Sequence, residues 1–380
     1  MKAVYLFLFL AIQAFNIRAE LINIGVFADY SVQQFEFNAR AGSYTIFTEK
    51  GRLKEISPQD IIMLTYLNKQ IEIKHNKISL GQFDKVSFIG TGWYNHFKIA
   101  IKSPIQKEHR YDDNLKIQLT NKGFQLINNI DLDNYIAGVV EAEVGRRPVE
   151  EYHKLQAIIC RTYALANLKK HFADGYNLCD RVHCQAYHGK TFLDQISKAS
   201  QSTRGEVIVD SDIELITAAF HSNCGGETVK SGNVWSKNLY YLDEVMDTFC
   251  LKTSNAHWEK VIPKVNWINY VTARAPQVQK NDFKQNFTPT QRTLTYLNIS
   301  ELRVKDIRHD WKLRSTYFSV FSEGDNILLK GRGYGHGVGL CQQGAMEMAR
   351  LGFSYSDILH KYYKGVHLIN LSALEFFREN

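Results

Sequence analysis

A carboxylate at the end of an apolar helical stripe is the first feature able to carry chemistry. Positions i, i+3, i+4 and i+7 from Ile136 hold Ile, Val, Val and Glu143, so these four side chains share one helix face. Partial removal from water raises a carboxylate's pKa toward the range where it donates a proton near neutral pH. Glu141 is expected on the opposite, solvated side. The other interpretation is that Glu143 extends past the helix end and pairs with Arg146 or Arg147.

A single cation lies in a second, almost wholly apolar helix. Residues 157–165 read AIICRTYAL, in which Arg161 is the only charged side chain. A helix that is apolar or small nearly all round is buried. A buried guanidinium needs a partner, which a carboxylate or an anionic substrate would provide. The alternative is a structural Arg161 bound to backbone carbonyls.

Thiol and imidazole groups gather after this helix. Cys179, His183 and Cys184 form a Cys-x3-His-Cys cluster, and His171 precedes it by eight residues. Such ligands suit tetrahedral zinc, here in a structural role. In an oxidising compartment the alternative is a Cys179–Cys184 disulfide. Three other residues could replace His171 as the fourth ligand, namely His188, His221 and Cys224.

The elements that must position these groups come in blocks. Short alternating segments at 21–27, 43–47, 70–73 and 115–119 predict antiparallel strands. Asp133 is a suitable N-cap for a helix that ends at Gly145, and a second helix is expected from Pro148 to about His171.

The rest of the chain also places strands and helices in separate blocks. Residues 205–221 are expected to be strand, and 260–330 to be short strands forming a wing. Two helices, at about 341–351 and 356–364, close the domain. Strands and helices in separate blocks, without βαβ alternation, indicate an α+β fold.

The N-terminus has the pattern of an export signal. Lys2 precedes the apolar run 3–12, and small residues follow at Ala14 and Ala19. This order predicts a signal peptide cleaved after Ala19, with an uncleaved N-terminal membrane anchor as the alternative. We therefore expect an exported protein of the periplasm or cell envelope. The net charge of +7 is dispersed without a polybasic run, so no nucleic-acid partner is expected.

Three long stretches, taken together, resemble the SpoIID/LytB family. They read DNYIAGVVEAE at 133–143, FHSNCGGET at 220–228 and GRGYGHGVGLCQQGA at 331–345. Residues 155–157 and 161–164, together with Trp235, add to the match. The chain departs from the family at Tyr334, where Trp is usual, and at Cys341, where Ser is usual.

The resemblance implies a peptidoglycan lytic transglycosylase that acts on glycan strands lacking stem peptides. It places the catalytic glutamate on Glu143 and the active-site arginine on Arg161. Some family members carry a zinc site of two Cys and two His in the same place as residues 171–184. The substrate-binding residues that the three stretches suggest are His221, Ser222, Cys224, Tyr334, His336 and Gln342.

The resemblance also implies a domain plan. We expect a signal peptide at 1–19, an N-terminal β-rich region at 20–110, and a SpoIID-like catalytic domain at 111–380 that contains the wing. Glycines at alternate positions from 331 to 339 let the backbone approach a ligand or another strand closely. His336 lies among them as a hydrogen-bonding candidate for a sugar. The alternative is a bend that packs under the next helix.

One carboxylate suffices for the implied reaction. Hydrolysis of a glycosidic bond normally uses two carboxyl groups. A lytic transglycosylase needs one, since the sugar's own 6-hydroxyl attacks and forms a 1,6-anhydro ring. Asp131, Asp133 and Glu141 remain candidates for a second carboxylate. Two further hypotheses are a non-catalytic peptidoglycan-binding enhancer of a cell-wall amidase and a zinc-dependent amidohydrolase.

Overall fold

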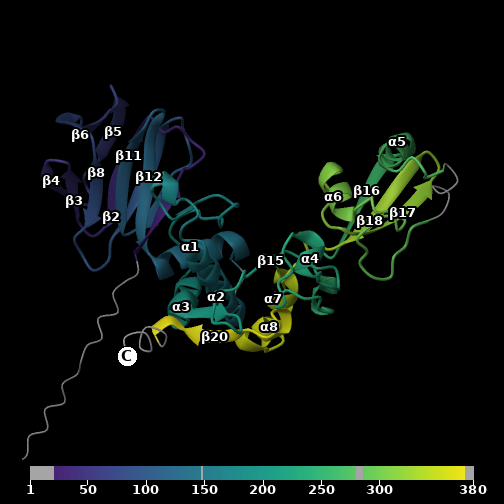
Figure 1. Ribbon diagram of the computed structural model, residues 1–380. Helices are drawn as coiled ribbons and strands as arrows, with labels where there is room; N and C mark the ends of the chain where they lie inside the picture. Colours follow the sequence, from purple (N-terminus) through teal and green to yellow (C-terminus); the bar gives the residue numbers. More distant parts are fainter. Residues whose placement is uncertain (1–20, 147–148, 280–285, 373–380) are drawn as a thin grey trace, which may run out of the picture.

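The computed structural model describes residues 21–146, 149–279 and 286–372. A β-sandwich lies at one end, helices α1, α2 and α3 pack beside it, and a smaller wing lies at the other end (Figure 1). The predicted α+β class is confirmed, because strands and helices occupy separate stretches of the chain. The predicted signal peptide lies outside the described residues. Within them, no helix is both long and apolar enough to cross a bilayer.

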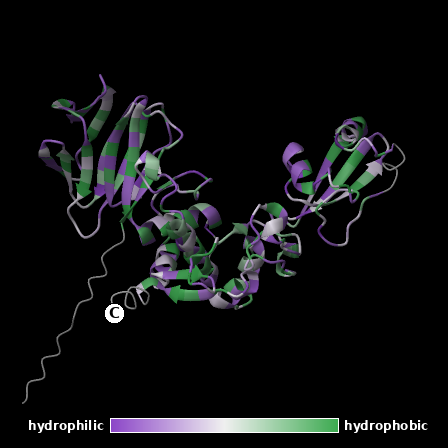
Figure 2. Ribbon diagram, viewed as in Figure 1, coloured by the Kyte–Doolittle hydropathy of each residue, from purple (hydrophilic) through white to green (hydrophobic). Residues whose placement is uncertain are grey.

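Two mostly antiparallel sheets form the sandwich, and their strands alternate apolar and polar side chains (Figure 2). The first sheet has the order β13-β1-β12-β11-β8-β3-β4, comprising Leu178–Cys179, Leu21–Val26, Gly123–Asp131, Asn114–Thr120, Val86–Gly90, Tyr44–Thr48 and Gly51–Ile56. The second has the order β10-β9-β2-β5-β6-β7, comprising His109–Asp112, His96–Ser103, Gln34–Ala41, Ile62–Leu67, Gln70–His75 and Ile78–Phe83.

Strands from both sides of residue 110 share the first sheet. β11 pairs with β8, and the whole length of β1 pairs with β12. Between the sheets, the rings of Phe37 and Phe88 stack at 3.9 Å. The buried apolar residues of the sandwich are continuous with those of α1 and α2. The first hundred residues therefore contribute to the same core as the helices.

Helix α1, Leu132–Val144, is buried along most of its length. Its N-cap is Asp131 and not Asp133: the Asp131 carboxylate accepts hydrogen bonds from the backbone N–H groups of Asp133 and Asn134. This corrects the sequence expectation by two residues. It leaves the Asp133 carboxylate free for another partner.

Helix α2, Glu150–Ala166, ends before the predicted end at His171. Asn167 adopts a non-helical conformation, and its side-chain amide donates to the carbonyl of Tyr163. Asparagine competes in this way with the backbone ladder and ends the helix. The short 3-10 helix Phe172–Asp174 follows, so His171 lies in a loop.

The remaining elements around the helices are short. The stretch expected as strand over 205–221 is strand only at its two ends, since β14 pairs with β20 and β15 pairs with β19. These elements are α3 Asp194–Ser202, β14 Glu206–Val209, β15 Phe220–His221, α4 Ser231–Val234, a 3-10 helix at Phe249–Lys252, β19 Leu340–Cys341, α7 Gln342–Arg350, α8 Tyr355–Tyr362 and β20 His367–Asn370.

The wing has a core of its own, centred on the fully buried Trp267. Its sheet has the order β16-β18-β17. The alternation of the sequence predicted strands here, and the structure adds two helices to them. The wing elements are β16 His257–Pro263, α5 Lys264–Arg274, α6 Val304–Asp310, β17 Tyr317–Glu323 and β18 Asn326–Arg332.

A buried ion pair joins α2 to the start of α1. The Arg161 side chain is fully buried and donates from Nε and Nη2 to Asp133 Oδ1, at 3.1 and 2.7 Å. It also donates to the carbonyls of Ser200 and Glu206, which lie in and beyond α3. The partner that the sequence required is therefore a carboxylate, supplemented by backbone carbonyls.

Removing this cation should destabilise the protein strongly. We expect Arg161→Met to lower the free energy of unfolding by about 3 kcal/mol, because it leaves two carbonyls without their donor and the buried Asp133 carboxylate with only the more exposed Arg204 as a cationic partner. Urea denaturation measures the change. The matched control is Arg52→Met, whose exposed pair with Glu55 should contribute less than about 1 kcal/mol. Equal effects of the two substitutions would contradict the structural role of Arg161.

Candidate functional site

Glu143 lies in the last turn of α1 and is half-buried. Its Oε1 accepts a hydrogen bond from the backbone N–H of Ala186 at 3.3 Å. Burial raises the pKa of Glu143, while the Ala186 hydrogen bond and the charge of His188 act in the opposite direction. A carboxylate near a helix C-terminus is further disfavoured by the helix dipole. The desolvation expected from the apolar stripe is therefore present.

An open groove of about 710 Å³ runs beside this turn. Ala142 and Gly145, on either side of Glu143 in sequence, line it together with His188. Cationic side chains outnumber acidic ones, and the exposed Phe192 ring lies within cation–π distance of two of them. The groove cations are Lys107, Arg110, Arg146 and Lys190.

Glu141 differs from its expected solvated position. It is half-buried in the wall of the same groove, and its Oε2 accepts a hydrogen bond from the backbone N–H of Phe192 at 3.3 Å. The loop carrying Phe192 folds back over this face of α1, which the helical wheel could not show. Glu141 and Glu108 are thus the two carboxylates that line the groove.

Arg161 does not line the groove. All of its described hydrogen bonds go to Asp133 and to backbone carbonyls in the interior. Sequence reasoning had offered this structural arrangement as the alternative to an active-site role. Arg204 also approaches the Asp133 carboxylate, at 3.1 Å.

The six predicted substrate-binding residues lie in another part of the structure, around β15, β19 and α7. None of them lines the groove beside α1. The side chain of Tyr334 is 46% exposed and lies 5.7 Å from the Arg314 guanidinium, so it can offer a ring face to a ligand. His336 packs at 5.5 Å from Trp235, and burial lowers its pKa to about 4, which leaves it neutral.

The other members of this set are less accessible. His221 is buried, with Nδ1 hydrogen-bonded to the Val338 carbonyl. Ser222 Oγ accepts a hydrogen bond from Asn255. Among the described residues, neither His221 Nε2 nor Gln342 Nε2 has a hydrogen-bond partner. Both nitrogens are buried, so a ligand at the surface of this structure does not reach them.

The alternating glycines meet other backbone segments. A side chain at Gly333 would come within 2.6 Å of the Asn223 carbonyl oxygen, and one at Gly339 within 2.2 Å of that of Ala219. Both have positive φ values. The glycine-rich loop therefore packs closely against residues 219–225, and this contact explains the glycines at these positions without a bound ligand.

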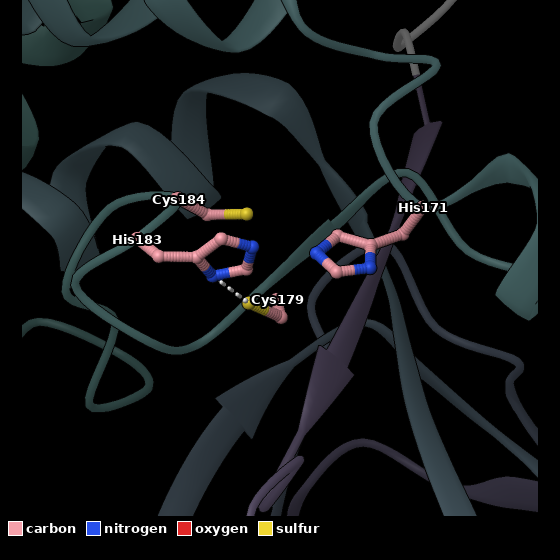
Figure 3. A group of neighbouring side chains, drawn as sticks. All are labelled: His171, Cys179, His183 and Cys184. Atoms are coloured by element: carbon pink, nitrogen blue, oxygen red, sulfur yellow. Dashed lines mark hydrogen bonds between the residues drawn. The ribbon is translucent and has the colours of Figure 1, made fainter.

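The four predicted metal ligands do come together (Figure 3). One donor atom each from His171, Cys179, His183 and Cys184 lies within 4.8 Å of the others. Cys179 Sγ is 3.4 Å from His183 Nδ1. His171 Nδ1 is held by Asp174 Oδ2 at 2.8 Å, so its Nε2 is directed toward the cluster. The structure thus selects His171 over His188, His221 and Cys224.

A second cluster escaped sequence reasoning. Cys224, Asp247, Cys250 and Cys341 are all buried and place one donor atom each within 4.8 Å of the others. The four residues span more than a hundred positions, and only the D-x2-C spacing of Asp247 and Cys250 is local. Cys224, predicted to bind substrate, is fully buried in this cluster and has no surface to offer a sugar.

One part of the chain matches a known protein family. Residues 120–209 match the family described as SpoIID, Stage II sporulation protein. These residues therefore carry a SpoIID domain.

Curated relatives extend this match. Over 276 residues the chain is 29% identical to Stage II sporulation protein D of Bacillus subtilis, covering 66% of this chain and 77% of the relative. The corresponding protein of Bacillus amyloliquefaciens is 29% identical over 275 residues, with 64% and 75% covered. An amidase enhancer of Bacillus subtilis is 25% identical over 291 residues, which cover 61% of this chain and 40% of the enhancer.

The raised pKa of Glu143 makes a testable contribution to stability. A carboxyl group with a folded-state pKa above its ordinary value of 4.5 binds protons more tightly in the native state. It therefore costs no stability below pH 4.5, and the cost develops as the pH rises through the folded-state pKa. We expect Glu143→Gln to be more stable than wild type at neutral pH and equal to it at low pH.

Thermal unfolding at a series of pH values measures this difference. Gln retains an oxygen that can accept the Ala186 hydrogen bond, so the comparison isolates the charge. Glu55→Gln, at an exposed site, is the control for a general charge effect. A stability difference for Glu143→Gln that does not change with pH would contradict the desolvated carboxyl group.

Proposed function

We propose that the protein is an exported lytic transglycosylase that cleaves peptidoglycan glycan strands lacking stem peptides, with Glu143 as its general acid and base. The SpoIID domain and the likeness to an amidase enhancer support a function in the cell wall. The single observation that carries the transglycosylase proposal is the half-buried Glu143 carboxyl group, in a helix turn whose residues Ala142 and Gly145 line an open groove. Burial keeps a proton on this group at higher pH than in water.

Glu143 would act twice in this reaction. Its protonated form donates to the glycosidic oxygen as the bond to the anomeric carbon breaks. The 6-hydroxyl of the same sugar then attacks that carbon, and the Glu143 carboxylate accepts the hydroxyl proton. One strand becomes two, one end carries a 1,6-anhydro ring, and no water is consumed. The proton returns to Glu143, which is ready for the next cycle.

The groove suits a glycan stripped of its peptides. Each muramyl sugar without a stem peptide exposes a lactyl carboxylate, so the strand is an anionic polymer. The excess of Lys and Arg along the groove complements this charge. The exposed Phe192 ring, flanked by Arg110 and Lys190, offers a flat face on which a sugar can stack.

Arg161 serves this site as a positioning residue. It ties α2 and the α3 region to the first turn of α1 through Asp133. Because α1 is a rigid helix, fixing its first turn fixes the direction of its last turn, where Glu143 lies. In this proposal Arg161 acts on the site indirectly, through the position of α1.

The first cluster fits a structural zinc ion. Two thiols and two imidazoles form a complete tetrahedral donor set with no position left for a water molecule. His171 Nε2 is buried without a hydrogen-bond partner among the described residues, and the Asp174 carboxylate holds Nδ1 on the other side of the ring, as carboxylates behind metal-binding histidines do. When bound, zinc would hold together a segment with little regular structure. Ala186, which contacts Glu143, lies two residues beyond Cys184.

A second candidate function is a non-catalytic enhancer that binds peptidoglycan or a wall amidase. The likeness to an amidase enhancer favours it. It would use the same basic groove without using the Glu143 proton. If the protein is such an enhancer, the wild type binds glycan without cleaving it, and Glu143→Gln still binds glycan.

Glu143→Gln should abolish cleavage. Without the acid, we expect the rate to fall by about 10²- to 10⁴-fold, because a general acid contributes this much. Mass spectrometry of products from peptide-free peptidoglycan detects the 1,6-anhydro ends. Wild-type activity should also decline as the pH rises through the raised pKa of Glu143, since the acid must be protonated.

The matched control is Glu141→Gln, a neighbouring carboxyl group in the groove wall. It should retain most of the activity if one carboxyl group suffices. Equal loss in both variants would indicate a two-carboxylate hydrolase with a non-anhydro product. No product from the wild type, together with unchanged glycan binding by Glu143→Gln, would establish the enhancer.

Asp174→Asn should weaken metal binding at the first cluster. Loss of the carboxylate behind His171 is expected to lower zinc affinity by about 10- to 100-fold. Competition with a chromogenic chelator measures the affinity. The control is Asp212→Asn, an exposed turn residue far from the cluster in sequence. Unaltered zinc affinity in Asp174→Asn would contradict the proposal that Asp174 orients His171 toward the metal.

A further inference from the structure

Three thiols and a carboxylate converge in the interior beneath the glycine-rich loop. Cys224 Sγ lies 3.4 Å from Cys250 Sγ and 3.3 Å from Asp247 Oδ2. Cys341 Sγ completes the group, with all four donor atoms within 4.8 Å of one another. Cys224, Cys250, Cys341 and Asp247 each have an exposed fraction of 0%. Solvation by water therefore does not explain the grouping of these ionisable side chains.

These separations match those of ligands around a tetrahedral zinc ion. Zn–S bonds of about 2.3 Å and Zn–O bonds of about 2.0 Å place neighbouring sulfurs about 3.8 Å apart and sulfur about 3.5 Å from oxygen. A disulfide bond would instead require two sulfurs at about 2.05 Å. All six cysteines of the protein are free thiols in the structure.

The surroundings supply the donors that bound thiolates require. Cys341 Sγ accepts from the backbone N–H groups of Cys224, at 3.2 Å, and Gly344, at 3.4 Å. The second of these belongs to the first turn of α7, whose dipole also favours negative charge. The Tyr362 hydroxyl donates to Asp247 Oδ2 at 3.0 Å. Such outer-shell donors orient ligands and offset the charge of a metal-bound thiolate.

We propose that Cys224, Cys250, Cys341 and Asp247 form a second structural zinc site, separate from the His171 cluster. Its donor set is complete and buried, so it leaves no open position for catalysis. It fixes three segments that are far apart in sequence: the turn after β15, the 3-10 helix Phe249–Lys252 and the start of α7. The base of the glycine-rich loop packs on the first of these segments.

Metal and thiol counts on the full-length protein test the proposal. The wild type, purified without reductant, should contain about two zinc ions per chain by elemental analysis. The double substitution Cys179→Ser and Cys184→Ser should remove the first ion and leave one. Cys250→Ser should also leave one, and combining the three substitutions should leave none. Cys160→Ser is the control, since this buried thiol belongs to neither cluster and should retain both ions.

A count of free thiols in the denatured, unreduced wild type keeps the proposal falsifiable if a variant fails to fold. Six thiols and two zinc ions support it. If the wild type contains one zinc ion and the double substitution Cys179→Ser and Cys184→Ser removes it, the proposal is overturned. Six free thiols would then mean that the second cluster consists of plain thiols, and four free thiols would mean that two of its cysteines form a disulfide. One zinc ion that instead survives that double substitution and is lost in Cys250→Ser would support this site and refute the first.

Discussion

The buried ion pair between Arg161 and Asp133 is the constraint on which the site depends. It connects the middle of α2 to the first turn of α1, and backbone carbonyls from α3 and from the start of β14 complete the guanidinium's hydrogen bonds. A buried charge cannot move without losing these partners, so the helices have one relative position. Glu143 is at the far end of the same helix, α1.

The two cysteine clusters lie in parts of the chain that have little regular secondary structure, where the proposed zinc ions would act as cross-links. Residues 167–193 contain only a 3-10 turn and a two-residue strand, and residues 222–256 contain two short helical turns. Each stretch contributes to one of the two cysteine clusters. Loops that bury few apolar side chains gain little from the hydrophobic effect and need another source of order.

The wing and the groove beside α1 lie in different parts of the molecule. The wing has its own apolar core and joins the remainder through β16 and β18, next to the glycine-rich loop. The groove beside α1 is instead formed from strands and loops of the sandwich side, including β10 and the segment before α3. The motifs at 220–228 and 331–345 therefore lie on a different surface from the motif at 133–143, although all three carry the family resemblance.

The sequence by itself determined the α+β class, the apolar stripe that ends at Glu143 and the local Cys/His cluster. These depend on spacing within about ten residues, where periodicity and ligand type are directly readable. Tertiary structure decided the rest. Only packing shows that Asp131 caps α1 and that Arg161 binds Asp133. Glu141 turns into the groove wall because a loop fifty residues later covers it. Cys224 and Cys341 meet because β15 and β19 pair, and Cys250 joins them from the 3-10 helix Phe249–Lys252. Contacts between residues so far apart leave no trace in local spacing.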